Sequence, residues 1–403
     1  MARITVLGGC GAVGRVAVRT LKALPDFEEI IIADINTDAA ELLAEELGEA
    51  CTAFEVDALK PKSIQSAIKG SDVVLNCVGP FYKFGPPILQ AVIKAGLPYV
   101  DVCDDVEPTQ ALLAMDGQAK KAKVSALIGM GSSPGVSNLL VKFAAEQLLE
   151  RVDAVDIYHA HGGEPTEGAA VVAHRIHAMT SEIPMFLDGK QQTVRFFDDD
   201  GVALREEVAF HQIGTYLCYP YPHPETITLP NYISCQRVTN KGTVLPEQYF
   251  QFIMDLVQLG LTGEEPITVK GVQVAPRDFT IAYIIKERER ILEETQFGVQ
   301  RGCAKIVVSG SKEGKPHQYV FSLWSIGQAM GEGTGIPAAI GATLMQRGKI
   351  PTKGVFPPEA VVNPMEFLAV MQEVLNLERM TGASSPLLIE SVDANGNVKE
   401  LSL

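Results

Sequence analysis

The amino-acid sequence predicts an α/β protein, in which a doubly wound parallel sheet carries a second, inserted α+β domain. Three observations lead to this prediction. The first third of the chain repeats a short apolar run followed by a helical stretch, a glycine-rich turn follows the first run, and the apolar periodicity changes from about residue 152. Alternating strands and helices are typical of a parallel sheet. The length of 403 residues exceeds what one ordinary core holds, which favours two domains.

Six apolar runs are expected to form the strands of the first sheet, with helices such as 38–47 and 87–95 between them. Right-handed connections between such strands produce a doubly wound sheet. The expected strands are Ile4 to Leu7, Glu29 to Ala33, Ala53 to Val56, Val73 to Val78, Tyr99 to Val102 and Val124 to Ile128.

The first turn carries the clearest motif in the chain. The first run ends in Gly8-Gly-Cys-Gly-Ala-Val-Gly14, a helical segment follows, and the second run stops at Asp34. Strand, glycine triplet, helix, strand and acid together are the dinucleotide-binding fingerprint of a Rossmann sheet. Gly9 allows the turn, Gly11 lets a pyrophosphate approach, and Gly14 lets the helix lie close to the strand. The amides at the helix start, at Ala12 and Val13, face the phosphates.

Asp34 bears on the choice of cofactor. Its carboxylate would accept hydrogen bonds from the adenosine ribose and repel a 2′-phosphate, so the sequence favours NAD over NADP.

Ligands of a doubly wound sheet bind beyond the carboxyl ends of its strands, so the residues after each run are the candidate site. Asp57 is placed to meet the adenine amino group, and the bend Cys77-Val-Gly79 can admit the cofactor closely. For Asp57, a turn-capping role is equally favoured. Further along the chain come Asp101, Asp104 and Asp105, and then the loop 129–138, which contains Ser133 and resembles both a hinge and part of an active site.

The remainder of the chain is expected to form the inserted domain and the returning helices. The predicted division is 1–133 plus 327–403 for the dinucleotide-binding domain and 134–326 for the substrate and dimerisation domain. Helices are expected at Asn138 to Leu149, Pro246 to Leu259 and Asp278 to Glu293. Near the C-terminus, a glycine turn leading into a small-residue helix is expected over Gly331 to Met345, and a helix at Pro364 to Met380, before an edge-pairing or frayed tail after Gly382. The strands of the inserted domain are expected at Val152 to His161, Gln192 to Phe197, Ile267 to Val274, Ala304 to Ser309 and His317 to Leu323.

Composition excludes several classes of function. A formal net charge of −15 argues against a nucleic-acid partner. No apolar run approaches the ~20 residues of a membrane span, and the N-terminus resembles a core strand instead of a signal sequence, so a cytoplasmic protein is expected. The seven cysteines are scattered and fit reduced, buried thiols. No metal site is expected, although His159 and His161 could face one way on a strand, as could His174 and His177 on a helix.

The motifs together resemble the saccharopine dehydrogenase-like family over nearly the whole chain. The most specific element is Asn76-Cys-Val-Gly-Pro-Phe-Tyr-Lys-Phe-Gly-Pro-Pro87. The other elements that carry the resemblance are the first turn, Ala95-Gly-Leu-Pro-Tyr-Val-Asp101, Gly131-Ser-Ser-Pro-Gly135, the stretch from His223-Pro-Glu225 to Pro230, Thr334-Gly-Ile-Pro-Ala-Ala-Ile-Gly341, Gly348-Lys-Ile and Gly354-Val-Phe-Pro-Pro-Glu359.

The resemblance implies a nicotinamide-dependent dehydrogenase that transfers hydride at a carbon–nitrogen bond of an amino acid, such as lysine or saccharopine, in a homodimer. The second domain lacks the aromatic and arginine pattern of saccharopine reductase, so the substrate itself is not implied. Such chemistry needs a proton-handling group, for which Tyr82, Lys83, Asp104 and Asp105 are candidates. It also needs cations for carboxylates, for which Arg175 and Arg237 are candidates. For Lys83 a solvated loop residue is the favoured alternative, and Arg175 could equally be a surface helix residue. The stretch 239–242 is interpreted as a polar turn.

Two other functions fit the sequence. One is a catalytically silent NAD-binding sensor or assembly protein, which would keep the first turn and lack a productive cleft. The other is an amine synthase that uses NAD without net cofactor turnover.

Overall fold

The computed structural model describes residues 2–164, 167–326, 330–379 and 387–401. The chain divides into two compact units. The first contains Met1–Leu149, Asn231–Ile233 and Met330–Ser385, and the second contains Glu150–Pro230, Ser234–Ala329 and Pro386–Leu403. The main difference from the predicted division lies at the C-terminus, because residues 387–401 join the second unit and not the first. The predicted end point Met380 and the start of the tail at Gly382 lie outside the described residues.

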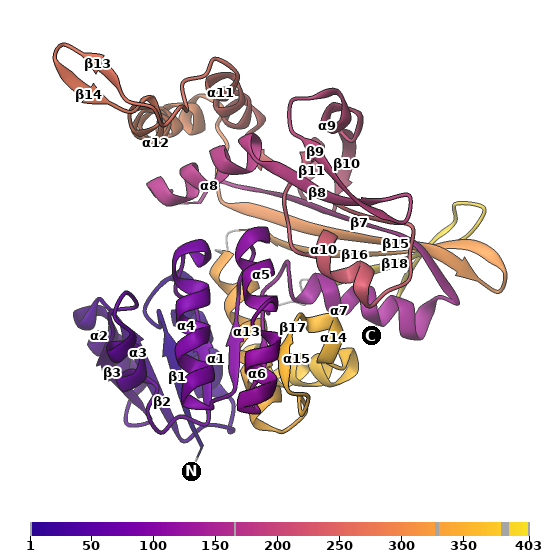
Figure 1. Ribbon diagram of the computed structural model, residues 1–403. Coiled ribbons are helices and arrows are strands. Elements are labelled where there is room, and N and C mark those ends of the chain that lie inside the picture. Colours follow the sequence, from indigo (N-terminus) through magenta and orange to yellow (C-terminus); the bar gives the residue numbers. More distant parts are fainter. Residues whose placement is uncertain (1, 165–166, 327–329, 380–386, 402–403) are drawn as a thin grey trace. The chain divides into compact units, whose positions relative to one another are not determined.

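The first unit is built on a seven-stranded parallel sheet in the order β17-β6-β5-β4-β1-β2-β3 (Figure 1). This order confirms the predicted doubly wound sheet. The C-terminal part of the chain adds one strand, β17, to the six predicted ones. The strands are β1 (Arg3–Leu7), β2 (Glu29–Asp34), β3 (Cys51–Glu55), β4 (Val73–Asn76), β5 (Tyr99–Asp101), β6 (Ser125–Leu127) and β17 (Gly354–Phe356).

Helices form two groups around this sheet. The strand order reverses between β1 and β4, and right-handed connections therefore send helices to opposite faces. Helix α1 packs against α2, α13 and α15, whereas α4 packs against α3, α5 and α6. The helices of this unit are α1 (Ala12–Ala23), α2 (Thr37–Leu47), α3 (Pro61–Ala67), α4 (Phe81–Ala95), α5 (Val106–Leu113), α6 (Asp116–Ala122), α7 (Val136–Phe143), α13 (Met330–Gln346), α14 (Pro358–Val361) and α15 (Pro364–Arg379).

Two helices of this unit differ from their predicted bounds. Helix α4 begins at Phe81 and contains Pro86 and Pro87, although the prediction started it at Pro87. The amides of Lys83 and Phe84 donate to the carbonyl of Pro80 at 3.1 Å, so the first turn of the helix closes before the two prolines, which have no amide hydrogen to donate. The predicted helix 138–149 is α7 followed by a π-helix over Ala144–Leu148.

The second unit is built on a mixed sheet in the order β10-β11-β12-β7-β15-β16-β18-β19, with β8 and β9 attached to β12. Strands β7 and β12 are parallel, and their neighbours pair antiparallel. The strands are β7 (Arg151–Gly162), β8 (Glu182–Leu187), β9 (Lys190–Arg195), β10 (Glu206–Phe210), β11 (Gly214–Pro220), β12 (Arg237–Leu245), β15 (Arg301–Lys312), β16 (Lys315–Ile326), β18 (Leu387–Val392) and β19 (Val398–Leu401).

Two predictions for this unit are wrong. The stretch 239–242 is not a turn but the buried middle of β12, hydrogen-bonded to β7. The expected single strand 267–274 is a separate hairpin of β13 (Ile267–Val269) and β14 (Val272–Val274), in which Lys270 and Gly271 adopt positive φ values of 51° and 82°. Two residues in this conformation form a tight hairpin turn.

Helices of the second unit pack on one another over the end of β12. Val172 and Ile176 of α8, Tyr249 of α11 and Ile284 of α12 share one buried cluster with Val244. The helices are α8 (Ala169–Thr180), α9 (Asp199–Ala203), α10 (Glu225–Thr228), α11 (Glu247–Gln258) and α12 (Pro276–Glu294).

Candidate active site

The turn after β1 has the geometry that a bound pyrophosphate requires. A Cβ added at Gly14 would lie 2.0 Å from the carbonyl oxygen of Gly8, so helix and turn are in backbone contact there. At Gly11, the N-cap of α1, an added Cβ would meet only that same oxygen, at 3.4 Å. The protein itself therefore does not fill the space in front of Gly11, and the amides of Ala12 and Val13 begin the helix beside it.

One glycine role was assigned to the wrong residue. The left-handed backbone conformation of the turn belongs to Gly8, with φ of 73°, and not to Gly9. Gly9 is needed for a different reason, because an added Cβ would lie 2.9 Å from Cγ2 of Ile32 on the neighbouring strand. Sequence reasoning missed this distinction because both residues are glycine.

Asp34 ends β2 beside the same turn. Its Oδ2 accepts the amide of Cys10 at 3.2 Å, and its Oδ1 accepts the amide of Asn36 at 3.0 Å. Each carboxylate oxygen has a second lone pair, which leaves acceptor capacity for ribose hydroxyls. The acid is thus fixed at the position that the fingerprint predicts.

Asp57, which follows β3, makes the contacts of a turn former. Its Oδ1 accepts the amide of Leu59 at 2.9 Å, and its Oδ2 lies 2.8 Å from Nζ of Lys60. The hydrogen bond and charge of Lys60, together with the Leu59 amide, lower the pKa of Asp57. These contacts are those expected for the turn-capping role of Asp57. A contact of Asp57 with adenine stays a prediction.

The bend after β4 is shaped by Asn76. Its Oδ1 accepts the amide of Val78 at 3.0 Å, while its Nδ2 donates to the hydroxyl of Tyr99 at 3.0 Å. An added Cβ at Gly79 would meet nothing within 4 Å, so this bend, with Cys77 and Val78, is open on one side. It lies at the same carboxyl edge of the sheet as the first turn, because β4 and β1 are parallel neighbours.

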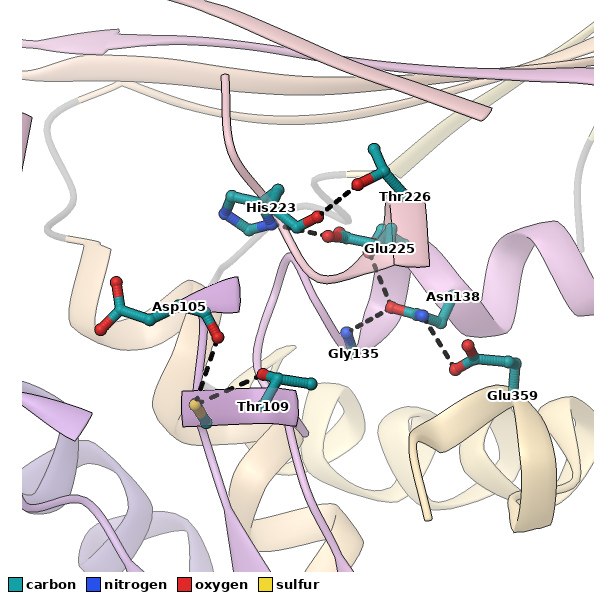
Figure 2. Close-up of polar contacts among 10 residues, drawn as sticks. Asp105, Thr109, Gly135, Asn138, His223, Glu225, Thr226 and Glu359 are labelled. Carbon is teal, nitrogen blue, oxygen red and sulfur yellow. Dashed lines mark hydrogen bonds and ion pairs between the residues drawn. The ribbon is translucent and has the colours of Figure 1, made fainter. Parts of the chain in front are cut away.

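Asp101 is the buried acid of this edge. Its Oδ1 accepts the amides of Gly129 at 2.8 Å and Cys103 at 3.1 Å, and so ties the ends of β5 and β6 together. Burial raises the pKa of Asp101 to about 6, against the lowering effect of these two amides. The thiol of Cys103 in turn contacts the hydroxyl of Thr109 at 3.5 Å and the carbonyl of Asp105 at 3.8 Å (Figure 2). Asp104 itself is exposed.

The candidate proton-handling residues Tyr82 and Lys83 lie in the first turn of α4, directly after the open bend. Tyr82 is 72% exposed, and the Nζ of Lys83 lies 5.0 Å from the ring centroid of Phe84. Both side chains are exposed at the edge of the sheet.

The loop that carries Ser133 is closed on itself. The amide of Gly131 donates to the carbonyl of Pro134, and the amide of Val136 donates to the carbonyl of Gly131, each at 2.9 Å. Asn138 locks the next turn, since its Oδ1 accepts the amide of Gly135 and its Nδ2 donates to Glu359 at 2.8 Å (Figure 2). Sequence reasoning missed Asn138 and Glu359 as partners because 221 positions separate them in the chain.

The two candidate arginines of the second unit are each bound to a carboxylate. Arg175, on α8, is buried and lies 2.5 Å from Oε1 of Glu167. Arg237, at the start of β12, is bidentate to Asp156 at 3.0 and 2.6 Å. Arg175 is therefore not the surface helix residue that one alternative expected, and a substrate carboxylate would have to compete with an existing ion pair at either residue.

Neither a metal site nor a membrane span is found among the described residues. No group of three or more His, Cys, Asp or Glu side chains in this part of the chain could hold a metal ion. No described helix is long and apolar enough to cross a bilayer.

Comparison with known proteins shows the family. Residues 4–127 match the saccharopine dehydrogenase NADP binding domain, and residues 131–377 match the saccharopine dehydrogenase C-terminal domain. The chain belongs to the saccharopine dehydrogenase family. This membership confirms the resemblance stated from the sequence, and with it the prediction of a dehydrogenase that uses a nicotinamide dinucleotide. The geometry at Gly11 and Asp34 fits such a cofactor.

Individual relatives of this family member match over both units. Carboxyaminopropylagmatine dehydrogenase of Synechocystis is 24% identical, over 93% of this chain and 96% of the relative. Carboxynorspermidine synthase of Vibrio cholerae is 24% identical, over 91% of this chain and 94% of the relative. Among solved structures, apo saccharopine dehydrogenase (L-Glu forming) from Saccharomyces cerevisiae superposes with a TM-score of 0.70 at 16% identity, over 97% of this chain and 100% of that one, and confirms the fold.

Proposed function

We propose that the chain is an NAD-dependent oxidoreductase that forms or breaks the carbon–nitrogen bond between an amine and a carboxyaminopropyl group, as in carboxylated polyamine precursors. The observation that carries this proposal is the match to the two relatives above. Their names describe carboxylated polyamine substrates or products, and each match covers more than nine-tenths of this chain. The lysine or saccharopine substrate that was first expected is thereby moved to second place.

The cofactor would be held by the carboxyl edge of the first sheet. The open turn at Gly11 and the first amides of α1 suit the pyrophosphate, Asp34 suits the adenosine ribose, and the bend 77–79 lies at the edge next to them. When bound, the nicotinamide supplies a hydride to, or takes one from, the substrate carbon that is bonded to nitrogen. Asp34 supports NAD as the preferred cofactor, since a 2′-phosphate would approach its carboxylate.

Three exposed residues of this edge are our candidates for moving the proton on the substrate nitrogen. Lys83 and Tyr82 stand in the first turn of α4, and Asp104 follows β5, which is the neighbour of β4. A lysine ammonium group or a tyrosine hydroxyl can donate a proton to nitrogen, and a carboxylate can accept one.

The test follows nicotinamide absorbance when purified enzyme is mixed with NADH, a primary amine such as agmatine, and the amino-acid aldehyde whose imine would give a carboxyaminopropyl amine on reduction. We expect NADH oxidation only when amine and aldehyde are both present. Oxidation with the aldehyde alone would make the protein an aldehyde reductase, and no oxidation with any amine despite NADH binding would favour the silent alternative. The variant Lys83→Met should lower kcat, with Lys69→Met, an exposed lysine after α3, as the matched control.

A further inference from the structure

The second unit carries a cluster of polar side chains on one face of its sheet, which we call the histidine cluster: His159, His161, Tyr221, His223 and Asn240. His159 and His161 are two residues apart on β7 and therefore share a face. In the parallel pairing of β12 with β7, Asn240 stands opposite Ile157 and Gly242 opposite His159, which places Asn240 on that same face.

Aromatic contacts hold the cluster together. The ring of His159 lies 5.0 Å from that of Tyr221, 6.0 Å from that of His223 and 6.3 Å from that of His161, between centroids. A Cβ added at Gly242 would lie only 1.8 Å from Cε1 of His159, so the imidazole rests directly on the strand at this glycine. The sequence of β12 thus makes room for His159.

Asn240 is the unexplained member. It is fully buried, and neither its Oδ1 nor its Nδ2 has a hydrogen-bond partner among the described residues. The Nε2 of His159 is likewise buried without a partner in that part of the chain. Native proteins rarely leave a buried amide without hydrogen-bond partners, because burial removes the water that would otherwise satisfy it. A ligand that offers both a donor and an acceptor would satisfy the amide.

The charges of the cluster indicate what kind of ligand fits. Burial and the neighbouring His161 and His223 together lower the pKa of His159 to about 3, so this imidazole is neutral. Glu225, fully buried, places its Oε2 2.6 Å from Nδ1 of His223 and thereby adds one acidic group beside a basic one (Figure 2). The cluster contains no lysine or arginine. Charged side chains of both signs border the cluster, because Glu164 lies 3.1 Å from Nδ1 of His161, Glu225 lies beside His223, and the charge of Arg175 acts on Tyr221. A zwitterion would therefore find donors, acceptors and charges of both signs.

We infer that Asn240 and His159 bind the ammonium and carboxylate groups of an α-amino acid moiety, which is the head group of the substrate. This inference rests on the proposed function and adds a subsite to it. The Asn240 Oδ1 accepts from the ammonium group and its Nδ2 donates to the carboxylate, while His159 fixes one of the two groups through Nε2.

The experiment compares two substrates in wild type and in Asn240→Leu. One substrate is the imine with the complete amino-acid head group, and the other lacks both the α-amino and the α-carboxyl group. For the complete substrate we expect Asn240→Leu to raise KM by about tenfold or more, because the charge-assisted hydrogen bonds to both groups are lost, with kcat within about twofold. For the truncated substrate KM should change by less than twofold. Gln318→Leu, at an exposed position on β16 of the same sheet, is the matched control.

Stability separates a binding role from a structural one. Replacing an unpaired buried amide by leucine should leave the melting temperature of the apo protein unchanged or raise it. A large drop in melting temperature would show that Asn240 is structural and would overturn the inference, as would equal KM changes for both substrates.

A binding measurement keeps the inference testable if the proposed reaction fails. Wild type that turns over neither substrate contradicts the proposed function alone. In that case L-2-aminobutyrate, which carries the head group, should raise the melting temperature of wild type and Gln318→Leu but not of Asn240→Leu, and neither butyrate nor propylamine should do so. Three results would overturn the inference. Butyrate or propylamine could also stabilise wild type, L-2-aminobutyrate could stabilise Asn240→Leu as much as wild type, or L-2-aminobutyrate could stabilise none of these proteins.

Discussion

Gly11 and Gly14 are three residues apart, yet the structure requires glycine at each for a different reason. Alanine at Gly14 would bring its Cβ to 2.0 Å from the Gly8 carbonyl, so Gly14→Ala should destabilise the fold by about 1–3 kcal/mol. Alanine at Gly11 meets only one oxygen at 3.4 Å, so Gly11→Ala should unfold like wild type and lose affinity for the cofactor. Denaturant unfolding and titration with NADH measure the two effects. Unchanged cofactor affinity in Gly11→Ala would contradict the assignment of the pyrophosphate site.

Asp34 makes a second prediction at this scale, concerning cofactor choice. Asp34→Ser removes the negative charge that a 2′-phosphate would face, so the ratio of kcat/KM for NAD over NADP should fall by about tenfold or more. The control is Asp38→Ser, which removes an exposed charge from the first turn of α2 and should leave the ratio unchanged. Wild type with a higher kcat/KM for NADP than for NAD would show that Asp34 does not select the cofactor.

Single residues were predictable where their role depends on the local backbone. Gly11, Gly14 and Asp34 belong to one turn between adjacent strands, so a short stretch of sequence determines their geometry. Arg175 and Asn240 were misread or missed because their surroundings come from elsewhere. The partner of Arg175 lies on the loop before α8, and the burial of Asn240 follows from the pairing of β12 with β7, which no local pattern reveals.

Among the elements, the ends of β5 and β6 are joined through the carboxyl group of Asp101, whose pKa is raised. Because the pKa of Asp101 in the folded protein, about 6, lies above the ordinary aspartate value of 3.8, the native state holds its proton over that interval and stability falls as pH rises through it. Asp101→Asn retains the acceptor oxygen for Gly129 and Cys103 and cannot titrate. The free energy of unfolding of wild type minus that of Asp101→Asn should therefore decrease between about pH 4 and pH 6 and then level off above about pH 7.

Chemical denaturation of both proteins across this pH range measures that difference. All other carboxyl groups titrate in both proteins and cancel. A difference that stays constant with pH would contradict a raised pKa for Asp101.

Helix α13 makes the other prediction at this scale. A Cβ at Gly335 would lie 2.7 Å from the carbonyl oxygen of Val13 and 2.8 Å from Cβ of Val16, both in α1. Helices α13 and α1 therefore touch at this glycine. Gly335→Leu should therefore lower the stability of the first unit by about 1–3 kcal/mol. Gly117→Ala is the matched control, because an added Cβ there meets nothing within 4 Å and alanine favours helix, with a gain of up to about 1 kcal/mol. Equal melting temperatures for Gly335→Leu and wild type would contradict the close packing.

Elements with regular periodicity were predicted well, and those with mixed signals were not. The first six strands of the parallel sheet are continuous apolar runs and lie where expected. Strand β12 carries buried polar residues, among them Lys241, which is paired with Glu206, and therefore resembled a turn. Helix α4 was shortened because two prolines lie inside it. The C-terminal strand β18 pairs with β16, and β19 pairs with β18. The pairing with β16 is a long-range contact that sequence alone does not show.

For the whole molecule, the family and the fold are settled by the match of both units, while several expectations stay predictions. Homodimer formation and a cytoplasmic location are among them, as is the choice of NAD. The net charge of −15 is consistent with the proposed amine substrates, because a negatively charged protein attracts polycations over long range. The proposed reaction accounts for both units together, since the first would hold the cofactor and the second would hold the amino-acid head group.

The central claim is that hydride passes to a carbon bonded to nitrogen. The most direct measurement uses NADH with deuterium at both C4 positions, agmatine and the amino-acid aldehyde, followed by mass spectrometry of the product. The account predicts a secondary amine that carries one deuterium on the former aldehyde carbon, which is now bonded to nitrogen. Deuterium on the carbinol carbon of an alcohol, or a product without deuterium, would contradict it.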